Sequence, residues 1–262
     1  MLIDIHAHLD HERFKDDLDK IIENARKAGV KAIITSGVNH ATNLKALEIE
    51  KRYPDIVKIS LGLYPLDALD EELKTSDGFP RDIEKVNVDE ELKFIEKNKD
   101  RIVAVGEVGL DLNWSKDHLE EQIKVFKKII ELVEKIDKPI IVHSRKAEEK
   151  VIEILERSKI KKIVLHCFSG SKKLIKRAVD NGWYFSIPPV ITRLQHFQML
   201  VDMVNMNQLL TETDCPYLSP YIGQKNEPSF VRETIRKIAE IKRMNETEVE
   251  QNIFMNYKNV FE

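Results

Sequence analysis

Two histidines one residue apart, His6 and His8, end the apolar run MLIDIHAHL at the start of the sequence. In a β-strand, alternate side chains share a face, so both imidazoles can point the same way at the carboxyl end of this strand. Neutral imidazoles bind metals well, and the pair would contribute to a metal site if further ligands converge on it. Alone, a His-x-His pair is more often simply the polar end of a strand, so the rest of the sequence decides.

Four further residues of metal-binding type follow later apolar runs. They are Glu107 in VAVGEVGLD, His143 in IIVHSR, His166 in IVLHCFSG and Asp214 in TETDCPYL. Taken singly, each would more simply be a hydrogen-bonded rim residue, a salt-bridged carboxylate or a turn cap. Together with the first pair they make six coincidences of residue type and position, and they predict a shared metal site.

Six ligands exceed the four of a tetrahedral zinc site, and they suit two divalent ions that share one bridging carboxylate. Glu107 is the natural bridge because it comes from the middle strand of the set. A two-metal site lowers the pKa of water and stabilises the attacking and leaving oxygens of a displacement. The predicted reaction is therefore hydrolysis.

The elements that would position these residues alternate between strands and helices. Apolar runs predict strands at residues 1–9, 30–35, 56–63, 102–107, 139–143, 163–167, 183–187 and 208–212. Helical spacing predicts helices at 14–28, 39–53, 89–97, 118–136, 147–158, 172–181, 194–205, 229–243 and 247–256. This rhythm is typical of an α/β protein, a single-domain (β/α)8 TIM barrel spanning residues 1–262 with an extra C-terminal helix. An open doubly wound sheet is disfavoured, because no glycine-rich phosphate motif follows any strand.

The barrel would bring the six residues to one rim, since barrel active sites lie at the carboxyl ends of the strands. The segment 66–88 breaks the alternation with charged runs and the turn signal SDGFP, and it is expected to be an exposed loop. In 262 residues, 42% are hydrophobic, which is enough for one large core.

Composition also bounds the location and partners of the protein. The sequence has no apolar stretch of about eighteen residues and no signal-peptide pattern, so we expect a cytoplasmic protein without membrane contact. Its two cysteines, Cys167 and Cys215, are too few for a disulfide framework and are expected to be small buried residues. A formal net charge of -3 argues against a broad basic nucleic-acid surface, so any phosphate contact should be local. No stable protein partner is predicted.

The motifs DIHAHL, GEVGLD, HSR, HCFSG and ETDCPYL, in this order, resemble those of the TatD-type metal-dependent hydrolases. That family is a deoxyribonuclease-like branch of the amidohydrolase superfamily, and Gln122, Phe126 and Asn226-Glu227-Pro228 also fit its pattern. The resemblance implies a barrel with two divalent metal ions and DNA phosphodiester bonds as the substrate.

The resemblance also implies a role for each ligand. His6, His8 and Asp214 would hold one ion and His143 and His166 the other, with Glu107 as the bridge. Asp214 would also orient or deprotonate the attacking water. Zinc, magnesium and manganese all remain open, because imidazole ligands favour a transition metal while phosphoryl transfer commonly uses magnesium.

Two residues are candidates for contact with the substrate phosphate. Tyr64 stands where the family usually has a histidine; tyrosine carries no positive charge near neutral pH, so phosphate binding should be weaker or differently selective. Arg145 either holds a phosphate with a bidentate fork or pairs with Glu149 four residues later. Asp111 either orients a ligating histidine or is a turn residue.

Three functions fit these features. The leading one is a two-metal phosphodiesterase that acts on DNA ends or single strands. The second is hydrolysis of a small C–N or ester substrate, as in amidohydrolases; these usually bridge their metals with a carbamylated lysine, and Glu107 stands at that position. The third is a metal-loaded binding protein without turnover.

Overall fold

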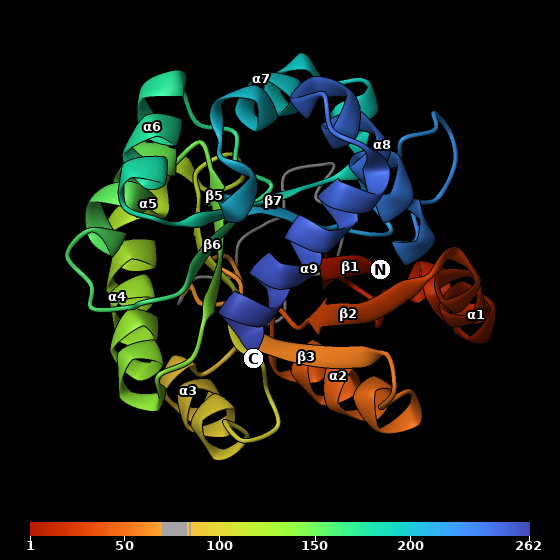
Figure 1. The fold of residues 1–262 in the computed structure, drawn as a ribbon. Coiled ribbons are helices and arrows are strands. Elements are labelled where there is room, and N and C mark those ends of the chain that lie inside the picture. The colour runs from red at the N-terminus through yellow and green to blue at the C-terminus, as the bar shows by residue number, and fades with distance from the viewer. Residues whose placement is uncertain (70–82, 84) are drawn as a thin grey trace.

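The computed structural model describes residues 1–69, 83 and 85–262, and within them eight parallel strands form one sheet in sequence order (Figure 1). The strands are β1 (Leu2–Ala7), β2 (Val30–Ser36), β3 (Val57–Leu63), β4 (Ala104–Asp111), β5 (Ile140–Arg145), β6 (Ile163–His166), β7 (Tyr184–Ile187) and β8 (Leu209–Thr211). The helices are α1 (Leu18–Ala28), α2 (His40–Arg52), α3 (Val88–Lys97), α4 (Leu119–Ile136), α5 (Glu148–Leu155), α6 (Lys172–Asp180), α7 (Gln195–Met203), α8 (Val231–Lys242) and α9 (Glu246–Phe261). The predicted (β/α)8 barrel with an extra C-terminal helix is confirmed.

The sheet curls until β8 lies beside β1. The hydroxyl of Thr211 donates to the carbonyl of Ile3, and the amide of Asp214 donates to the carbonyl of His6 over 2.9 Å. These contacts place the segment after β8 directly against the carboxyl end of β1. The last predicted metal ligand therefore lies next to the first pair.

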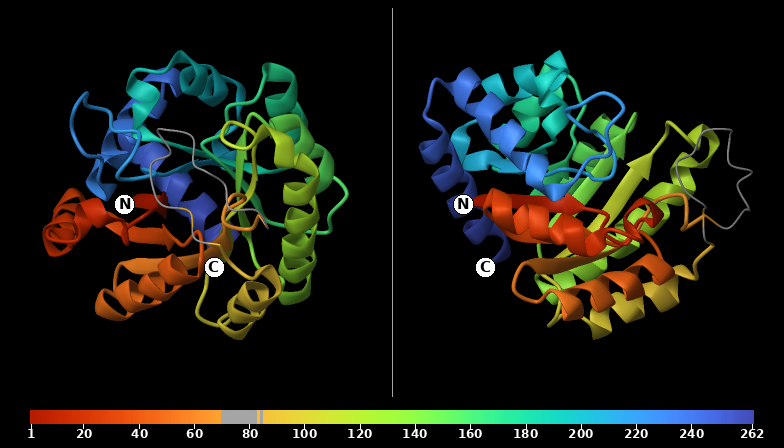
Figure 2. Two further views of the ribbon diagram at one scale, coloured as in Figure 1. Left: turned by 180° about the vertical axis from the view of Figure 1, so that it is seen from behind. Right: turned by 90° about the vertical axis from the view of Figure 1, so that its right-hand side faces the viewer.

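Helix α9 lies at the opposite end of the barrel from that segment. Its Asn256 side chain donates to the carbonyls of Met206 and Leu209, both at 2.7 Å, and Leu209 is the first residue of β8. The side view shows α9 near the N-terminus, at the end where the strands start (Figure 2). The extra helix thus covers the amino end and leaves the carboxyl end of the strands to the loops.

The core follows from the residue pattern of the strands and helices. Strands buried on both faces read as nearly continuous apolar runs, as parallel strands do, and all six residues of β1 are buried. In α4, Phe126, Ile129 and Val133 form the stripe that packs on the sheet, each at most 1% exposed. Each fully buried side chain of this size contributes about 1.5–3 kcal/mol, so the barrel wall is a rigid frame for the rim.

Several predicted boundaries are wrong in informative ways. Strand β4 runs to Asp111, so Glu107 lies within the strand and not at its end. The expected exposed loop at 66–88 begins with buried residues, since Leu66, Ala68 and Leu69 are at most 3% exposed. Residues 70–82 and 84 of that prediction lie outside the described part of the chain. Within the described part, no helix has both the length and the apolar character needed to cross a membrane.

Candidate metal centre

All six predicted ligands converge at the carboxyl end of the barrel. His6 lies in β1, Glu107 in β4, His143 in β5 and His166 at the end of β6, while His8 and Asp214 follow β1 and β8. All but His6 line one cavity of about 320 Å³, and the ring of His6 is fully buried directly beneath it. Five strands therefore supply one site, and no two of its histidines except the first pair are close in sequence.

Glu107 lies at the centre of the cluster. Its Oε2 is 3.4 Å from His6 Nε2 and 3.5 Å from His8 Nε2. Its Oε1 is 2.8 Å from His143 Nδ1 and 3.6 Å from His166 Nε2. Each carboxylate oxygen thus faces a different histidine pair, which is the arrangement that a bridging carboxylate needs.

Asp214 completes the first half of the site. Its Oδ1 lies 3.3 Å from His8 Nε2 and 3.7 Å from His6 Nε2, and the ligand atoms of these three residues lie within 4.8 Å of one another. A second compact group joins His6 with Glu107 and His166. His143 belongs to neither compact group, although it makes the shortest contact to Glu107.

The nitrogen Nε2 of His6 indicates where a metal ion would fit among these residues. His6 Nε2 is buried and has no hydrogen-bond partner within the described residues, yet it faces two carboxylates. A buried polar atom without a partner is destabilising, and a cation between that nitrogen and the carboxylates would satisfy all three. Burial, and then the charge of His166, lower the pKa of His6, which favours the neutral imidazole that a metal requires.

One residue, Ser36 at the end of β2, contacts both His6 in β1 and His8 just after it. Its carbonyl lies 3.1 Å from His8 Nδ1, and its hydroxyl lies 3.1 Å from His6 Nδ1. Because a carbonyl only accepts, His8 must carry its proton on Nδ1, and its Nε2 lone pair faces Glu107 and Asp214. This role could not be predicted, because Ser36 lies 28 residues or more from its partners along the chain.

The other two histidines each contact a buried carboxylate. Asp111 Oδ2 is 3.0 Å from His143 Nε2, so of the two predicted roles of Asp111 the orienting one is supported. Glu212 Oε2 is 2.9 Å from His166 Nδ1, and this residue was not predicted. Glu212 stands two residues before Asp214 in TETDCPYL. Strand β6 pairs with β7 and β7 pairs with β8, and this strand order brings Glu212 to His166.

The protonation of the cluster shows how strongly it attracts positive charge. Burial lowers the pKa of His143, but the hydrogen bonds to Asp111 and Glu107 outweigh it and raise that pKa to about 9. The pKa of His166 is also raised, because Glu212 and Glu107 outweigh its burial. Burial favours a neutral Glu107, yet its three histidine neighbours hold its pKa well below the usual range. Metal ions would displace these imidazole protons, since both need the same lone pairs.

A buried carboxylate, Asp4, holds the two ends of the first ligand group together. It accepts from the amide of His6 at 3.3 Å and from the amide of Thr213 at 2.9 Å. Thr213 precedes Asp214, whose backbone has the left-handed φ of 55°. Asp4 was not predicted as a functional residue, although it stands in the motif DIHAHL.

Two glycines let β4 approach its neighbours closely enough to place Glu107. A Cβ on Gly62 of β3 would lie 2.4 Å from the amide nitrogen of Glu107. A Cβ on Gly109 would lie 1.9 Å from the carbonyl of His143, and its φ of +147° also disfavours a side chain. The close approach at Gly109 explains the second glycine of GEVGLD, and Gly62 makes the corresponding space on β3.

Both predicted substrate contacts line the cavity. Tyr64, 7% exposed, donates its hydroxyl proton to Asp111 Oδ2 at 2.6 Å and lies 3.4 Å from His143 Nε2. The guanidinium of Arg145 lies 5.8 Å from the centre of the Trp114 ring. Arg145 forms no ion pair within residues 1–69, 83 and 85–262, so the pairing with Glu149 is not observed.

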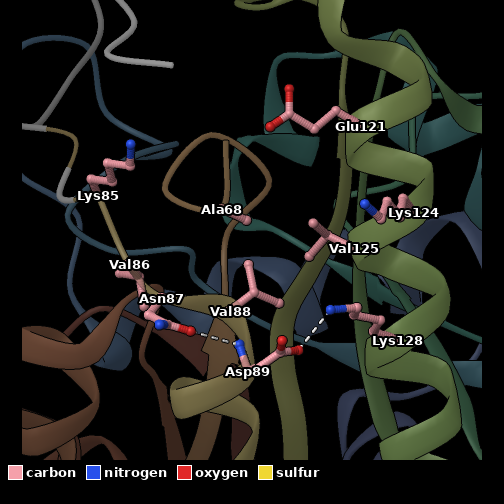
Figure 3. Close-up of a pocket in the computed structure, with 10 residues that line it drawn as sticks. All are labelled: Ala68, Lys85, Val86, Asn87, Val88, Asp89, Glu121, Lys124, Val125 and Lys128. Carbon is pink, nitrogen blue, oxygen red and sulfur yellow. Dashed lines mark hydrogen bonds and ion pairs between the residues drawn. The ribbon is translucent and has the colours of Figure 1, made fainter. Parts of the chain in front are cut away.

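The remaining candidates fit their simpler interpretations. Cys215 is fully buried and Cys167 partly buried, and neither belongs to a candidate metal group among the described residues. A second hollow of about 350 Å³ lies between α3 and α4 and is crossed by the ion pair of Asp89 and Lys128 at 2.6 Å (Figure 3). None of the six ligands lines it, so it is separate from the metal centre.

Comparison with known proteins agrees with this site. A family model described as TatD related DNase matches residues 3–262. An uncharacterized metal-dependent hydrolase of Methanocaldococcus jannaschii is 36% identical, over 97% of this chain and 94% of that protein. The human deoxyribonuclease TATDN3 is 33% identical, over 95% of this chain and 90% of that protein. The crystal structure of YJJV, a TatD homolog from Escherichia coli, has a TM-score of 0.85 at 26% identity, covering 99% of this chain and 97% of that one.

Proposed function

The chain belongs to the TatD-related DNase family, and from this premise we propose that it is a two-metal phosphodiesterase that cleaves DNA at ends or in single strands. The observation that carries the proposal is the position of Glu107, whose two oxygens each face a different histidine pair. The name of the human relative, a deoxyribonuclease, supports the choice of DNA.

In this proposal the chain holds two divalent ions, of zinc, magnesium or manganese. His6, His8 and Asp214 hold one ion and His143 and His166 the other, with Glu107 between them. When bound, such ions lower the pKa of water and offset the negative charge of the phosphodiester oxygens. His6 belongs to both compact ligand groups, which agrees with a position between the two halves.

Asp214 is the candidate that accepts a proton from the attacking water. Its side chain is 17% exposed, more than that of Glu107 at 6%, so it reaches the cavity while the bridge remains enclosed. The backbone amide of Asp214 is fixed to β1 by its hydrogen bond to His6. This anchoring keeps the carboxylate beside the two histidines as the proton moves.

Arg145 and Tyr64 divide the work that one histidine would do in relatives. The hydroxyl of Tyr64 donates its hydrogen bond to Asp111, so toward a phosphate it offers only an acceptor oxygen. It acts mainly through Asp111, which it helps to hold against His143. The positive contact to a phosphate oxygen therefore falls to Arg145.

Hydrolysis through a carbamylated lysine has no support in this cavity. Within the described residues no lysine lines it, and the bridging position is Glu107. The same site could still accept a small phosphodiester, because the six residues would contact the phosphate group and not the parts of the substrate on either side of it.

The proposal is tested by cleavage of end-labelled single- and double-stranded DNA with magnesium, manganese and zinc in parallel. Asp214→Asn should reduce cleavage by about 10²–10⁴-fold, because the proton acceptor and one ligand charge are lost. Asp137→Asn is the matched control, since Asp137 has a similar left-handed φ of 50° and lies at the far end of the barrel. Full cleavage by Asp214→Asn would refute the assignment.

A further inference from the structure

Five cations lie at or just after the carboxyl ends of three neighbouring strands. Arg145 is the last residue of β5 and Lys146 follows it, Lys172 and Lys173 begin α6 after β6, and Arg193 follows β7. All five are exposed, and Arg145 also lines the cavity. We refer to these five residues as the basic arc.

Hydrogen bonds tie the loops of the arc into one surface. The carboxylate of Glu148 accepts from the amide of Lys146 at 3.2 Å and from the hydroxyl of Ser169 at 2.8 Å, which joins the loops after β5 and β6. His196 Nε2 lies 3.1 Å from the carbonyl of Phe168, which joins the loop after β6 to the start of α7. These contacts hold the backbone beneath the cations, and the guanidinium of Arg193 also donates to the carbonyl of Ser219 at 2.7 Å.

The charges of the arc are not neutralised within the described part of the chain. None of the five forms an ion pair there, whereas lysines elsewhere do, such as Lys128 with Asp89 at 2.6 Å. Segments 145–149, 167–173 and 188–194 contain these five cations and two carboxylates, Glu148 and Glu149. One oxygen of Glu148, Oε1, accepts both of the hydrogen bonds above.

The segment after β1 is acidic by comparison. Residues 10–17 carry four carboxylates, Asp10, Glu12, Asp16 and Asp17, against the two cations Arg13 and Lys15, and Asp17 pairs with Lys225 at 2.7 Å. Among the described residues, a polyanion that reaches the cavity is therefore attracted more strongly along the basic arc than along segment 10–17.

We propose that the basic arc binds the phosphates of a single DNA strand that runs from the cavity across the loops after β5, β6 and β7. The inference rests on the proposed function and specifies how its substrate is held. Arg145 contacts the phosphate nearest the metal centre, and the lysines and Arg193 contact the phosphates that follow. The acidic segment 10–17 excludes a second strand, so the substrate is single-stranded where it meets the rim.

The test is a triple variant, Lys146→Gln, Lys172→Gln and Lys173→Gln, which leaves Arg145 in the cavity intact. The control removes three lysines at the amino end of the barrel, Lys159→Gln, Lys161→Gln and Lys162→Gln. Each protein is assayed on a single-stranded oligonucleotide of about 20 residues. It is assayed in parallel on bis(p-nitrophenyl) phosphate, a diester that can meet Arg145 in the cavity but is too small to reach the three lysines.

For the arc variant, kcat/KM on the oligonucleotide should fall about tenfold at low salt, with no change on the small diester. The slope of log KM against log salt should fall by about 2, since each lost contact removes about 0.7. The control should match the wild type on both substrates. If the arc variant keeps the wild-type KM and slope while DNA is cleaved, the arc proposal alone is overturned; if the wild type does not cleave DNA, the proposed function fails with it.

Discussion

Glu212, the carboxylate behind His166, offers a sharp test of how the chain prepares its ligands. It is fully buried and accepts three hydrogen bonds: from His166 Nδ1 at 2.9 Å, the amide of Cys167 at 2.9 Å and the hydroxyl of Ser186 at 2.7 Å. The change Glu212→Gln keeps the shape and turns one acceptor oxygen into a donor. At least one of the three donors then meets the amide nitrogen: the amide of Cys167 if that nitrogen replaces Oε1, or His166 Nδ1 and the hydroxyl of Ser186 if it replaces Oε2.

The magnitude follows from these contacts. A buried donor left without an acceptor costs about 1–3 kcal/mol of folding stability. Loss of the carboxylate behind a ligating histidine typically reduces metal affinity by about 10–100-fold, which is about 1.4–2.7 kcal/mol. The metal dissociation constant of Glu212→Gln should therefore rise by one to two decades, while kcat at saturating metal falls much less.

The measurement is metal titration against a competing fluorescent chelator, with activity recorded at each metal concentration. Glu156→Gln is the matched control, because Glu156 also accepts three hydrogen bonds, from Arg177 and Asn181, but at the surface. The control should bind metal as the wild type does. Wild-type metal affinity in Glu212→Gln would refute the role given to this carboxylate.

Three further predictions concern other parts of the site. Tyr64→Phe removes the hydrogen bond to Asp111 and should lower kcat about 3–10-fold with little change in KM. The reason is that Tyr64 acts on His143, through Asp111, and not on the phosphate. A large rise in KM alone would contradict this role. In the metal-free protein the pKa of His143 in the folded state is about 9, above its value in the unfolded chain. The contribution of His143 to the free energy of unfolding, about 1–3 kcal/mol, is therefore complete below pH about 6.5 and is lost as the pH rises toward 9. Chemical denaturation in a chelator across that range should show the decline, and stability that rises with pH would argue against the raised pKa. Gly109→Ala should destabilise the fold by about 3 kcal/mol or more, because its Cβ would lie 1.9 Å from the carbonyl of His143; a mild effect in thermal melting would show that β4 can move away.

The sequence could predict the ligands because their types are rare at strand ends and the barrel has only one place for such ends to meet. His6, His8, His143 and His166 were found in this way, and the structure brings all four together. Glu107 is predicted at a strand end, yet it lies within β4, since the strand continues through Gly109 to Asp111. Residue type places Glu107 in the cluster of histidines, as the structure shows, although the predicted strand boundary is wrong.

The supporting residues could not be predicted, for a physical reason. Ser36, Glu212 and Asp4 act through neighbours in space that lie far along the chain, 46 residues in the contact of Glu212 with His166. A serine or a carboxylate near a strand end has many ordinary roles, and only the closed sheet selects one. The burial of Leu66 and Leu69 could not be predicted for the same reason. The charged residues of segment 66–88 do not show which distant residues cover its first turn.

The central claim is that Glu107 joins two ions into one centre, and electron paramagnetic resonance of the manganese-loaded protein tests it directly. Two Mn²⁺ ions that share a carboxylate should give an exchange-coupled spectrum in the wild type, and Glu107→Gln should abolish that coupling together with DNA cleavage. Spectra of isolated Mn²⁺ at every metal loading of an active wild-type enzyme would contradict the claim.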